Sequence, residues 1–171
     1  MAKEKDNIKK QNENGLDQFF TKPKEAKRLF DLVCEKIDVN QFDLFVEPSV
    51  GANSFGCLFP KSKSLLMDIE PQENIFVVDE SGKTIRANAK EAKVKIIQMD
   101  FLSLGAVLKP LGLMTNKKVI AIGNPPFGKN SSLATKFFNI CAKFCDTICF
   151  IIPRTFKRVS VQNQLDLNFH L

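Results

Sequence analysis

The chain has 171 residues, of which 44% are hydrophobic and 26% charged, a composition that favours one folded domain with its own core and excludes a disordered chain. No run approaches the roughly 18 apolar residues of a membrane-spanning helix, so we expect no membrane span. The net charge of +6 weakly favours a polyanionic partner such as nucleic acid. The indication is weak because many basic proteins bind no nucleic acid.

The first fifteen residues, MAKEKDNIKKQNENG, are polar, and we expect residues 1–15 to form a flexible tail. They lack the apolar segment of a signal peptide. The five cysteines include no CxxC pair. Cys141, Cys145 and Cys149 are spaced by four, as ligands on one helix face would be, but their apolar surroundings favour buried free thiols. We therefore expect a reducing, cytoplasmic location and no metal site.

Apolar residues recur with helical spacing after the tail and predict an amphipathic helix over residues 24–37. Thr21 is placed to cap this helix, and Pro23 suits its first turn. A second helix is predicted from residue 133 to residue 144, where apolar side chains again recur every three or four positions.

Five apolar runs predict buried strands, and a hairpin is expected around the turn residues 79–83. The third strand is predicted over residues 94–99, and the fifth, TICFIIPRTF, is closed by Pro153. The first four strands end at Glu47, Asp68, Asp100 and Asn124.

Strands that alternate with helices or long crossovers, and that are apolar throughout, indicate an α/β fold with a mostly parallel sheet flanked by helices. In such a sheet, ligands bind at the carboxyl ends of the strands. The four polar residues at the strand ends are therefore expected to converge on one crevice. The plainer alternative is that they merely terminate strands.

Two stretches near these strand ends are candidates for ligand contact. In EPSVGANSFG, Gly51 would let the backbone approach a ligand, whereas the absence of GKS, GKT and a full GxGxxG disfavours a P-loop or an ordinary dinucleotide site. In AIGNPPFGKN, two consecutive prolines remove two backbone donors and fix two φ angles. An Asn and a Phe are thereby held on a rigid turn.

Four segments, in the order VEPSVGANSFG, LLMDIEP, IIQMDFL and NPPFG, resemble the motifs of class I S-adenosylmethionine-dependent methyltransferases that modify an exocyclic amino group. The closest resemblance is to adenine-N6 DNA and RNA methyltransferases, and DQFFTKP resembles their cofactor-capping segment. The resemblance extends from about Phe19 to about Phe156. It implies a Rossmann-like catalytic domain over residues 16–171, S-adenosyl-L-methionine as cofactor, and nucleic acid as substrate.

The resemblance also assigns roles in cofactor binding. Glu47 would meet the methionine moiety, and Asp68, with Glu70 as the alternative, would bind the ribose hydroxyls. Asp100 would accept a hydrogen bond from the adenine amino group. The full set of implied cofactor residues is Phe20, Thr21, Glu47, Pro48, Gly51, Asp68, Ile69, Asp100, Phe101 and Asn124.

Two positions leave this assignment open. Phe19, Phe20 or Thr21 would cover the cofactor, but the two phenylalanines equally suit the core or the tail. Asn53 stands where the glycine motif commonly has a second glycine, and a side chain there is expected to alter cofactor affinity.

The NPPF turn suits catalysis at an exocyclic amine, whose lone pair is delocalised into the ring. The Asn124 side-chain oxygen and the Pro125 carbonyl would accept its two N–H groups. Pro126 would stiffen the turn, and Phe127 would stack on a base that has left the duplex. The alternative interpretation is a tight hydrophobic turn with no catalytic role.

Family members usually continue with two more strands, so we expect a sheet truncated after its fifth strand and either a homodimer or a separate recognition subunit. Basic residues after the last two strands suit phosphate binding or a solvated rim equally. They are Lys129, Arg154, Lys157 and Arg158. A protein-glutamine N-methyltransferase and a non-catalytic module of the same fold are the alternative functions.

Overall fold

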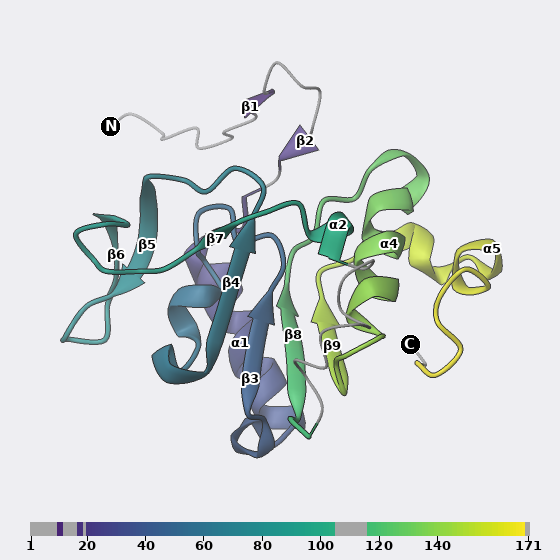
Figure 1. Cartoon of the computed structure of the whole chain (residues 1–171), viewed down its shortest axis with the longest axis horizontal. Helices are drawn as coiled ribbons and strands as arrows, with labels where there is room; N and C mark the ends of the chain where they lie inside the picture. Colours follow the sequence, from purple (N-terminus) through teal and green to yellow (C-terminus); the bar gives the residue numbers. More distant parts are fainter. Residues whose placement is uncertain (1–9, 12–16, 19, 105–115, 170–171) are drawn as a thin grey trace, which may run out of the picture.

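The computed structural model describes residues 10–11, 17–18, 20–104 and 116–169. Its centre is a five-stranded sheet in the order β7–β4–β3–β8–β9, and every neighbouring pair is parallel (Figure 1). The strands are β3 (Leu44–Glu47), β4 (Ser64–Asp68), β7 (Ile97–Gln98), β8 (Val119–Gly123) and β9 (Thr147–Phe150). The predicted α/β architecture with a parallel sheet flanked by helices is confirmed, and the strand order is Rossmann-like.

The strand order reverses beside β3. The chain moves from β3 outward to β4 and β7, then returns to β8 on the other side of β3 and continues to β9. All five residues of β8 are buried, as expected for a strand covered on both faces. The reversal places a crevice outside the carboxyl ends of β3 and β8, where ligands bind in open parallel sheets.

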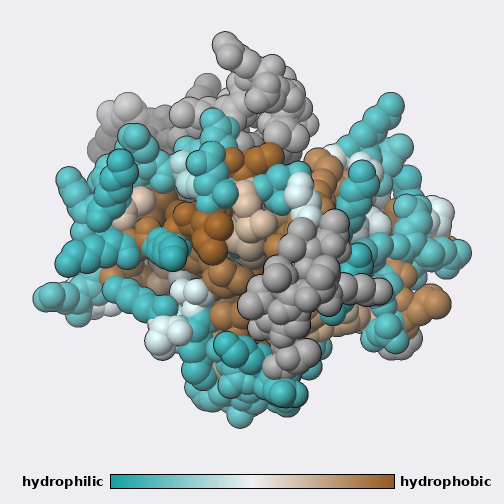
Figure 2. Space-filling model, viewed as in Figure 1, coloured by the Kyte–Doolittle hydropathy of each residue, from teal (hydrophilic) through white to brown (hydrophobic). Residues whose placement is uncertain are grey.

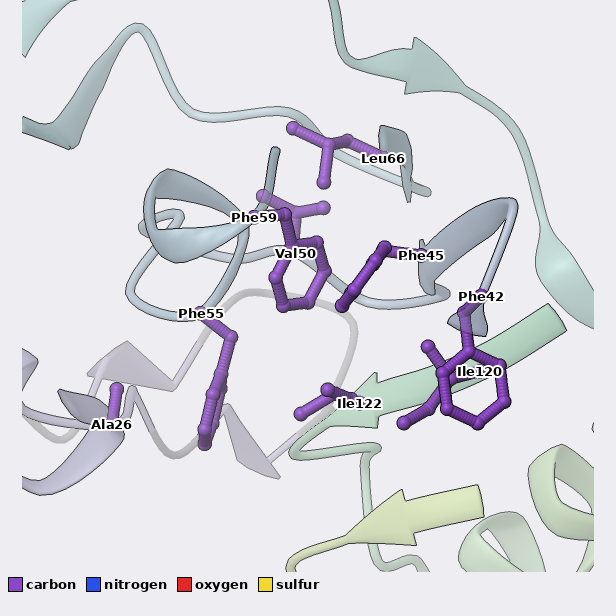
Figure 3. Packing of buried hydrophobic residues seen from close by; sticks show 9 residues of the cluster. All are labelled: Ala26, Phe42, Phe45, Val50, Phe55, Phe59, Leu66, Ile120 and Ile122. Atoms are coloured by element: carbon purple, nitrogen blue, oxygen red, sulfur yellow. The ribbon is translucent and has the colours of Figure 1, made fainter. Parts of the chain in front are cut away.

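One face of the sheet is covered by α1 (Pro23–Lys36), which confirms the predicted first helix (Figure 1). Ala26 is its fully buried contact with the core. The predicted cap at Thr21 is wrong: Lys22 is the N-cap residue, without a capping side-chain hydrogen bond, while Pro23 occupies the first turn as expected. Figure 3 shows the cluster on this face, which comprises Ala26, Phe42, Phe45, Val50, Phe55, Phe59, Leu66, Ile120 and Ile122.

The opposite face is covered by α2 (Phe101–Leu104) and α4 (Ser132–Cys141). The Phe101 ring lies 5.1 Å from the ring of Phe137, measured between centroids, and joins the two helices over the sheet. Cys141 and Cys145 are buried in this cluster, as their apolar pattern predicted, and all five cysteines are free thiols.

Smaller elements surround the sheet. The predicted hairpin is confirmed: β5 (Asn74–Val78) and β6 (Thr84–Asn88) pair antiparallel. The third predicted strand is shorter than expected, because Val94 and Ile96 pack against the core outside regular strand structure. Near the N-terminus, β1 (Lys10–Gln11) pairs antiparallel with β2 (Asp17–Gln18); the rest of the predicted tail, and Phe19, lie outside the described residues.

After β9, the chain forms η5 (Arg154–Lys157) and α5 (Val159–Gln162), which pack against α4 through Phe138, Phe156 and Val161. The other short helices are η1 (Val39–Gln41), η2 (Gly56–Leu58), η3 (Lys61–Lys63) and η4 (Lys129–Ser131). Within the described parts of the chain, no helix combines the length and the apolar character needed to cross a membrane.

Candidate functional site

A cavity of about 170 Å³ opens at the carboxyl ends of the strands. A smaller cavity of about 30 Å³ adjoins it, and the two share Phe20, Ser49, Gly51 and Asn124 in their walls. Thr21 and Glu47 line the smaller cavity. The other predicted site residues line the larger one: Phe20, Pro48, Gly51, Asp68, Ile69, Asp100, Phe101, Asn124, Pro125, Pro126 and Phe127. The structure thus brings together the described residues that the sequence nominated for cofactor binding and catalysis, whereas Phe19 lies outside the described residues.

The loop after β3 carries Gly51 in a left-handed conformation with φ +52°. A Cβ atom at this position would stand 3.0 Å from Cδ1 of Phe20, so the Phe20 ring lies directly against the glycine backbone. The Gly51 amide donates to Oδ2 of Asp68 over 2.7 Å. Gly51 therefore allows the Phe20 ring to approach the backbone closely, and its amide ties the loop to the end of β4.

Asn53, where the resemblance led us to expect a second glycine, has a left-handed backbone conformation with φ 63°. Asparagine adopts the left-handed region more readily than most residues. Its side chain is 1% exposed, and Nδ2 donates to the backbone oxygen of Phe76 over 2.8 Å. Asn53 lines neither cavity, so its side chain supports the loop from within and leaves the space above Gly51 open.

The carboxylate of Asp68 is buried, and both of its oxygens accept backbone hydrogen bonds. Oδ2 accepts from Gly51, and Oδ1 accepts from Glu70 over 2.8 Å. A carboxylate has about four acceptor positions, so each oxygen retains one for a ligand. Ile69, between the two acidic residues, is 52% exposed and presents an apolar side chain to the cavity.

Asp100 caps the short helix α2. Its Oδ1 accepts from the Leu102 amide over 2.9 Å, and its Oδ2 accepts from the Ser103 hydroxyl over 3.1 Å. The predicted strand end at Asp100 is wrong, because β7 ends at Gln98 and Asp100 instead caps α2; the residue also lines the larger cavity. Phe101 points its ring into the core, 2% exposed, rather than lying free in the cavity.

Glu47 is a fully buried carboxyl at the end of β3. Burial raises its pKa well above the ordinary glutamate value; the negative charge of Asp68 adds to the rise, and the Gly56 backbone amide opposes it. Its Oε2 has no hydrogen-bond partner. The atom borders the place where a side chain at Gly56 would begin. A buried carboxyl in this state favours either a proton or a cationic ligand.

The NPPF turn is held by bonds from three other segments. Asn124 donates from Nδ2 to the Thr21 hydroxyl over 3.2 Å, and its backbone oxygen accepts from the Ser49 hydroxyl over 3.4 Å. At the other end, the Phe127 carbonyl accepts from the amides of Leu133 and Ala134, over 3.2 and 3.3 Å. The turn is therefore fixed to the segment just before α1, the loop after β3 and the start of α4.

Several lining residues were not nominated by the sequence. They are Ser49, Gln72, Met99, Leu102, Leu133 and Phe137. Ser49 stands inside the glycine motif, so its position could have been inferred. Leu133 and Phe137 are four residues apart on the predicted helix, a spacing that shows a shared face but not which cavity this face adjoins.

The four basic residues named in the sequence are exposed beside the NPPF turn. Lys129 follows the turn in η4, whereas Arg154 and Lys157 lie in η5. The two short helices meet through a hydroxyl contact between Ser131 and Thr155. The structure thus brings together the two segments that carry these charges, and none of the four residues lines either cavity.

Taken together, the larger cavity is lined by apolar side chains, by the carboxylates of Asp68 and Asp100, and on one side by the NPPF turn. Figure 2 shows hydrophobic side chains near the centre of the molecular face seen in Figure 1, with hydrophilic ones around them. Among the described residues, no cluster of His, Cys, Asp and Glu side chains is arranged to bind a metal ion. Comparison with known proteins finds no match to any family model, curated protein or solved structure.

Proposed function

We propose that this protein transfers a methyl group from S-adenosyl-L-methionine to the N6 amino group of adenine in DNA or RNA. The supporting observation is that the four ordered motifs meet around one cavity at the reversal of strand order. Glycine loop, two acidic strand ends and NPPF turn all line that cavity. This is where a parallel sheet of this topology binds nucleotides.

The residues present fit the proposed cofactor. Glu47 supplies a buried oxygen without a partner, suited to the cationic amino group of the methionine part. Asp68 keeps one acceptor position on each oxygen for ribose hydroxyls. Ile69 offers an exposed apolar side chain to the adenine ring. When bound, the cofactor supplies an electrophilic methyl group attached to a sulfonium sulfur.

The chain's own contribution is to hold the target amine. The Asn124 side-chain oxygen and the Pro125 carbonyl accept its two N–H groups and favour a pyramidal nitrogen with an available lone pair. Held in this way, the nitrogen would be placed to accept the methyl group from the sulfonium cofactor, which would become a neutral thioether, and to release one proton to water. Phe127 packs against the face of the base and fixes its approach.

The turn contributes to the rate because its acceptors need little reorganisation. Two prolines restrict the backbone, and the contacts with Ser49, Thr21 and Leu133 hold both ends of the turn. Dipoles that are already oriented in the folded protein stabilise a developing positive charge without a further entropic cost.

The test is methyl transfer by the full chain from labelled S-adenosylmethionine to adenine-containing DNA and RNA oligonucleotides, with N6-methyladenosine detected by mass spectrometry of the nucleosides. Asn124→Ala should abolish transfer, because Asn124 holds the amine. An Asn124→Ala variant that still turns over would refute the mechanism. A folded wild-type chain that binds S-adenosylhomocysteine but methylates only protein glutamine would refute the substrate.

A further inference from the structure

The net positive charge of the chain comes from its second part. Residues 101–171 contain nine lysines and arginines but only two acidic residues, whereas residues 1–100 contain sixteen basic and seventeen acidic ones. The whole net charge of +6 is therefore carried by residues 101–171, which include the NPPF turn and the strands β8 and β9. Such an asymmetry between two parts of a chain indicates a polyanionic partner for the basic part.

The two acidic residues of this basic part do not neutralise it. Asp146 directly precedes β9, and its Oδ2 accepts from the amide of Val119, the first residue of β8, over 2.7 Å. Asp146 therefore lies at the amino edge of the sheet, opposite the edge that carries the larger cavity. The amide of Asp166 donates to Oδ1 of Asn139, near the end of α4. In the described parts of the chain, neither carboxylate forms an ion pair.

Four exposed basic residues follow the NPPF turn and the last strand of the sheet. None of the four forms an ion pair within the part of the chain that the structure describes, where the ion pairs lie on α1. Their charges are therefore available to a partner. We call these four residues the η4–η5 surface: Lys129, Arg154, Lys157 and Arg158.

The η4–η5 surface adjoins the NPPF turn. Lys129, the first residue of η4, is two residues beyond Phe127, and two residues of chain span at most about 7 Å. Phe127 itself lines the larger cavity and packs against the buried cluster that contains Phe156 of η5. The hydroxyl contact between Ser131 and Thr155 joins η4 to η5. Both short helices are thus next to the residue that leads into the cavity.

The strand order separates this surface from the acidic wall of the larger cavity. Asp68, Glu70 and Asp100 line that cavity and lie at or after the ends of β4 and β7. In the sheet, β4 and β7 lie on one side of β3, whereas β8 and β9, which lead into η4 and η5, lie on the other side. A polyanion at the site would therefore be repelled from the β4 side and attracted to the β9 side.

We propose that the η4–η5 surface binds the phosphates of the nucleic-acid strand whose adenine enters the larger cavity. The placement of the adenine rests on the proposed function, whereas the binding of phosphates does not. Lysine and arginine hold phosphates without reading the sequence of the strand. The surface therefore supplies affinity and the position of the strand, and the cavity supplies the choice of base.

Paired substitutions test whether the position of these charges matters. The surface variant is Arg154→Gln with Lys157→Gln. The control variant is Lys117→Gln with Lys143→Gln, which removes two exposed charges from the opposite edge of the sheet, before β8 and β9. Fluorescence anisotropy of a labelled single-stranded oligonucleotide gives the affinity of the full chain at several salt concentrations.

The expected effects follow from counterion release, which contributes a slope of about 0.7 per phosphate contact on a single strand. In the surface variant, the plot of log affinity against log salt concentration should become less steep by about 1–2, and affinity at about 0.1 M salt should fall about 10-fold to 30-fold. The control variant should keep the wild-type slope. An oligonucleotide without adenine should lose as much affinity, since phosphates carry no sequence information.

Kinetics separate strand binding from the reaction itself. For N6 methylation of an adenine-containing oligonucleotide, the surface variant should raise KM about 10-fold or more, as its weaker binding requires. Its kcat and its S-adenosylhomocysteine affinity should stay within about threefold, because none of the four residues lines either cavity. Lys129→Gln with Arg158→Gln is a second surface variant with the same expectation, and urea denaturation shows whether each variant is folded.

The outcomes distinguish this proposal from the proposed function. A surface variant with the wild-type salt slope would overturn it, and so would an equal loss of affinity in the control variant, because the position of the charges would then not matter. Wild-type protein that binds vesicles of anionic lipid but no oligonucleotide would also overturn it. Oligonucleotide binding as expected, by a wild-type chain that transfers no methyl group, would refute the proposed function and leave the role of the η4–η5 surface standing.

Discussion

Replacing Asn53 by glycine supplies the second glycine that the proposed methyltransferase function would lead one to expect, and we expect the change to weaken the protein without improving S-adenosylhomocysteine binding. Glycine and asparagine both accept φ 63°, so the change relieves little backbone strain. It does remove the 2.8 Å bond from Nδ2 to the Phe76 carbonyl in β5. The side chain is buried, so no water replaces that bond directly.

The magnitude follows from two terms. Leaving a buried polar group without its partner costs about 1–3 kcal/mol, and the greater freedom of glycine in the unfolded chain adds about 0.5–1 kcal/mol. Removing Oδ1 of Asn53, which is buried without a hydrogen-bond partner, offsets part of this loss. Asn53→Gly should therefore lower the free energy of unfolding by about 1–3 kcal/mol. S-Adenosylhomocysteine affinity should stay within about threefold, because Asn53 lines neither cavity.

Urea denaturation and calorimetric titration of S-adenosylhomocysteine measure these two quantities. Asn53→Ala is the matched control: it loses the same bond and places a Cβ in the left-handed region, which costs about 1–2 kcal/mol. The alanine variant should therefore be at least as unstable as the glycine variant. A glycine variant that is more stable than wild type, or that binds the ligand tenfold more tightly, would show that Asn53 obstructs the site instead of supporting it.

Two further predictions concern the buried surroundings of Glu47. Burial raises the pKa of the Glu47 carboxyl above its ordinary value of 4.5. The protonated side chain therefore makes its full contribution to stability below pH 4.5, and this contribution is lost as the pH rises through the raised pKa. Urea denaturation at several pH values should show this loss, at up to about 1.4 kcal/mol per pH unit, in wild type but not in Glu47→Gln; equal slopes would contradict it. The second prediction concerns Gly56→Ala. The added Cβ atom would lie 2.3 Å from Oδ1 of Asn53 and 2.7 Å from Cδ2 of Leu66. Stability should therefore fall by about 3 kcal/mol, the upper end of overpacking costs, and an unchanged urea midpoint would refute this.

Much of the sheet and its rim could be predicted because the relevant signals are local. Buried strands are continuously apolar, and parallel strands place their ends at one edge, so Glu47, Asp68 and Asn124 could be expected to converge. The cap at Thr21 could not be predicted correctly. Its hydroxyl is used by Asn124, and a contact across 103 residues leaves no trace in the neighbouring sequence.

The motif glycines show a different limit of sequence patterns. A pattern records the residue type that is common at a position, whereas the fold requires a backbone conformation. At position 53 that conformation is left-handed, and asparagine meets it while its side chain gains a partner below the loop. Val94 and Ile96 show the reverse case, because apolar character marks contact with the core but not strand pairing.

The pairing of β3 with β8 has a consequence for how the site comes into existence. Lys118 donates to Asp43 at the start of this pair, across 75 residues of chain, and Phe45 stands opposite Ile120. Closing a loop of this length loses chain entropy before the contacts of the two strands repay it, so such pairings form slowly. Because Glu47 and Asn124 follow these same two strands, a partly folded chain without this pairing has no cavity. The cavity of the proposed site therefore arises with the slow, long-range step of folding and not with the helices and hairpin that can form earlier.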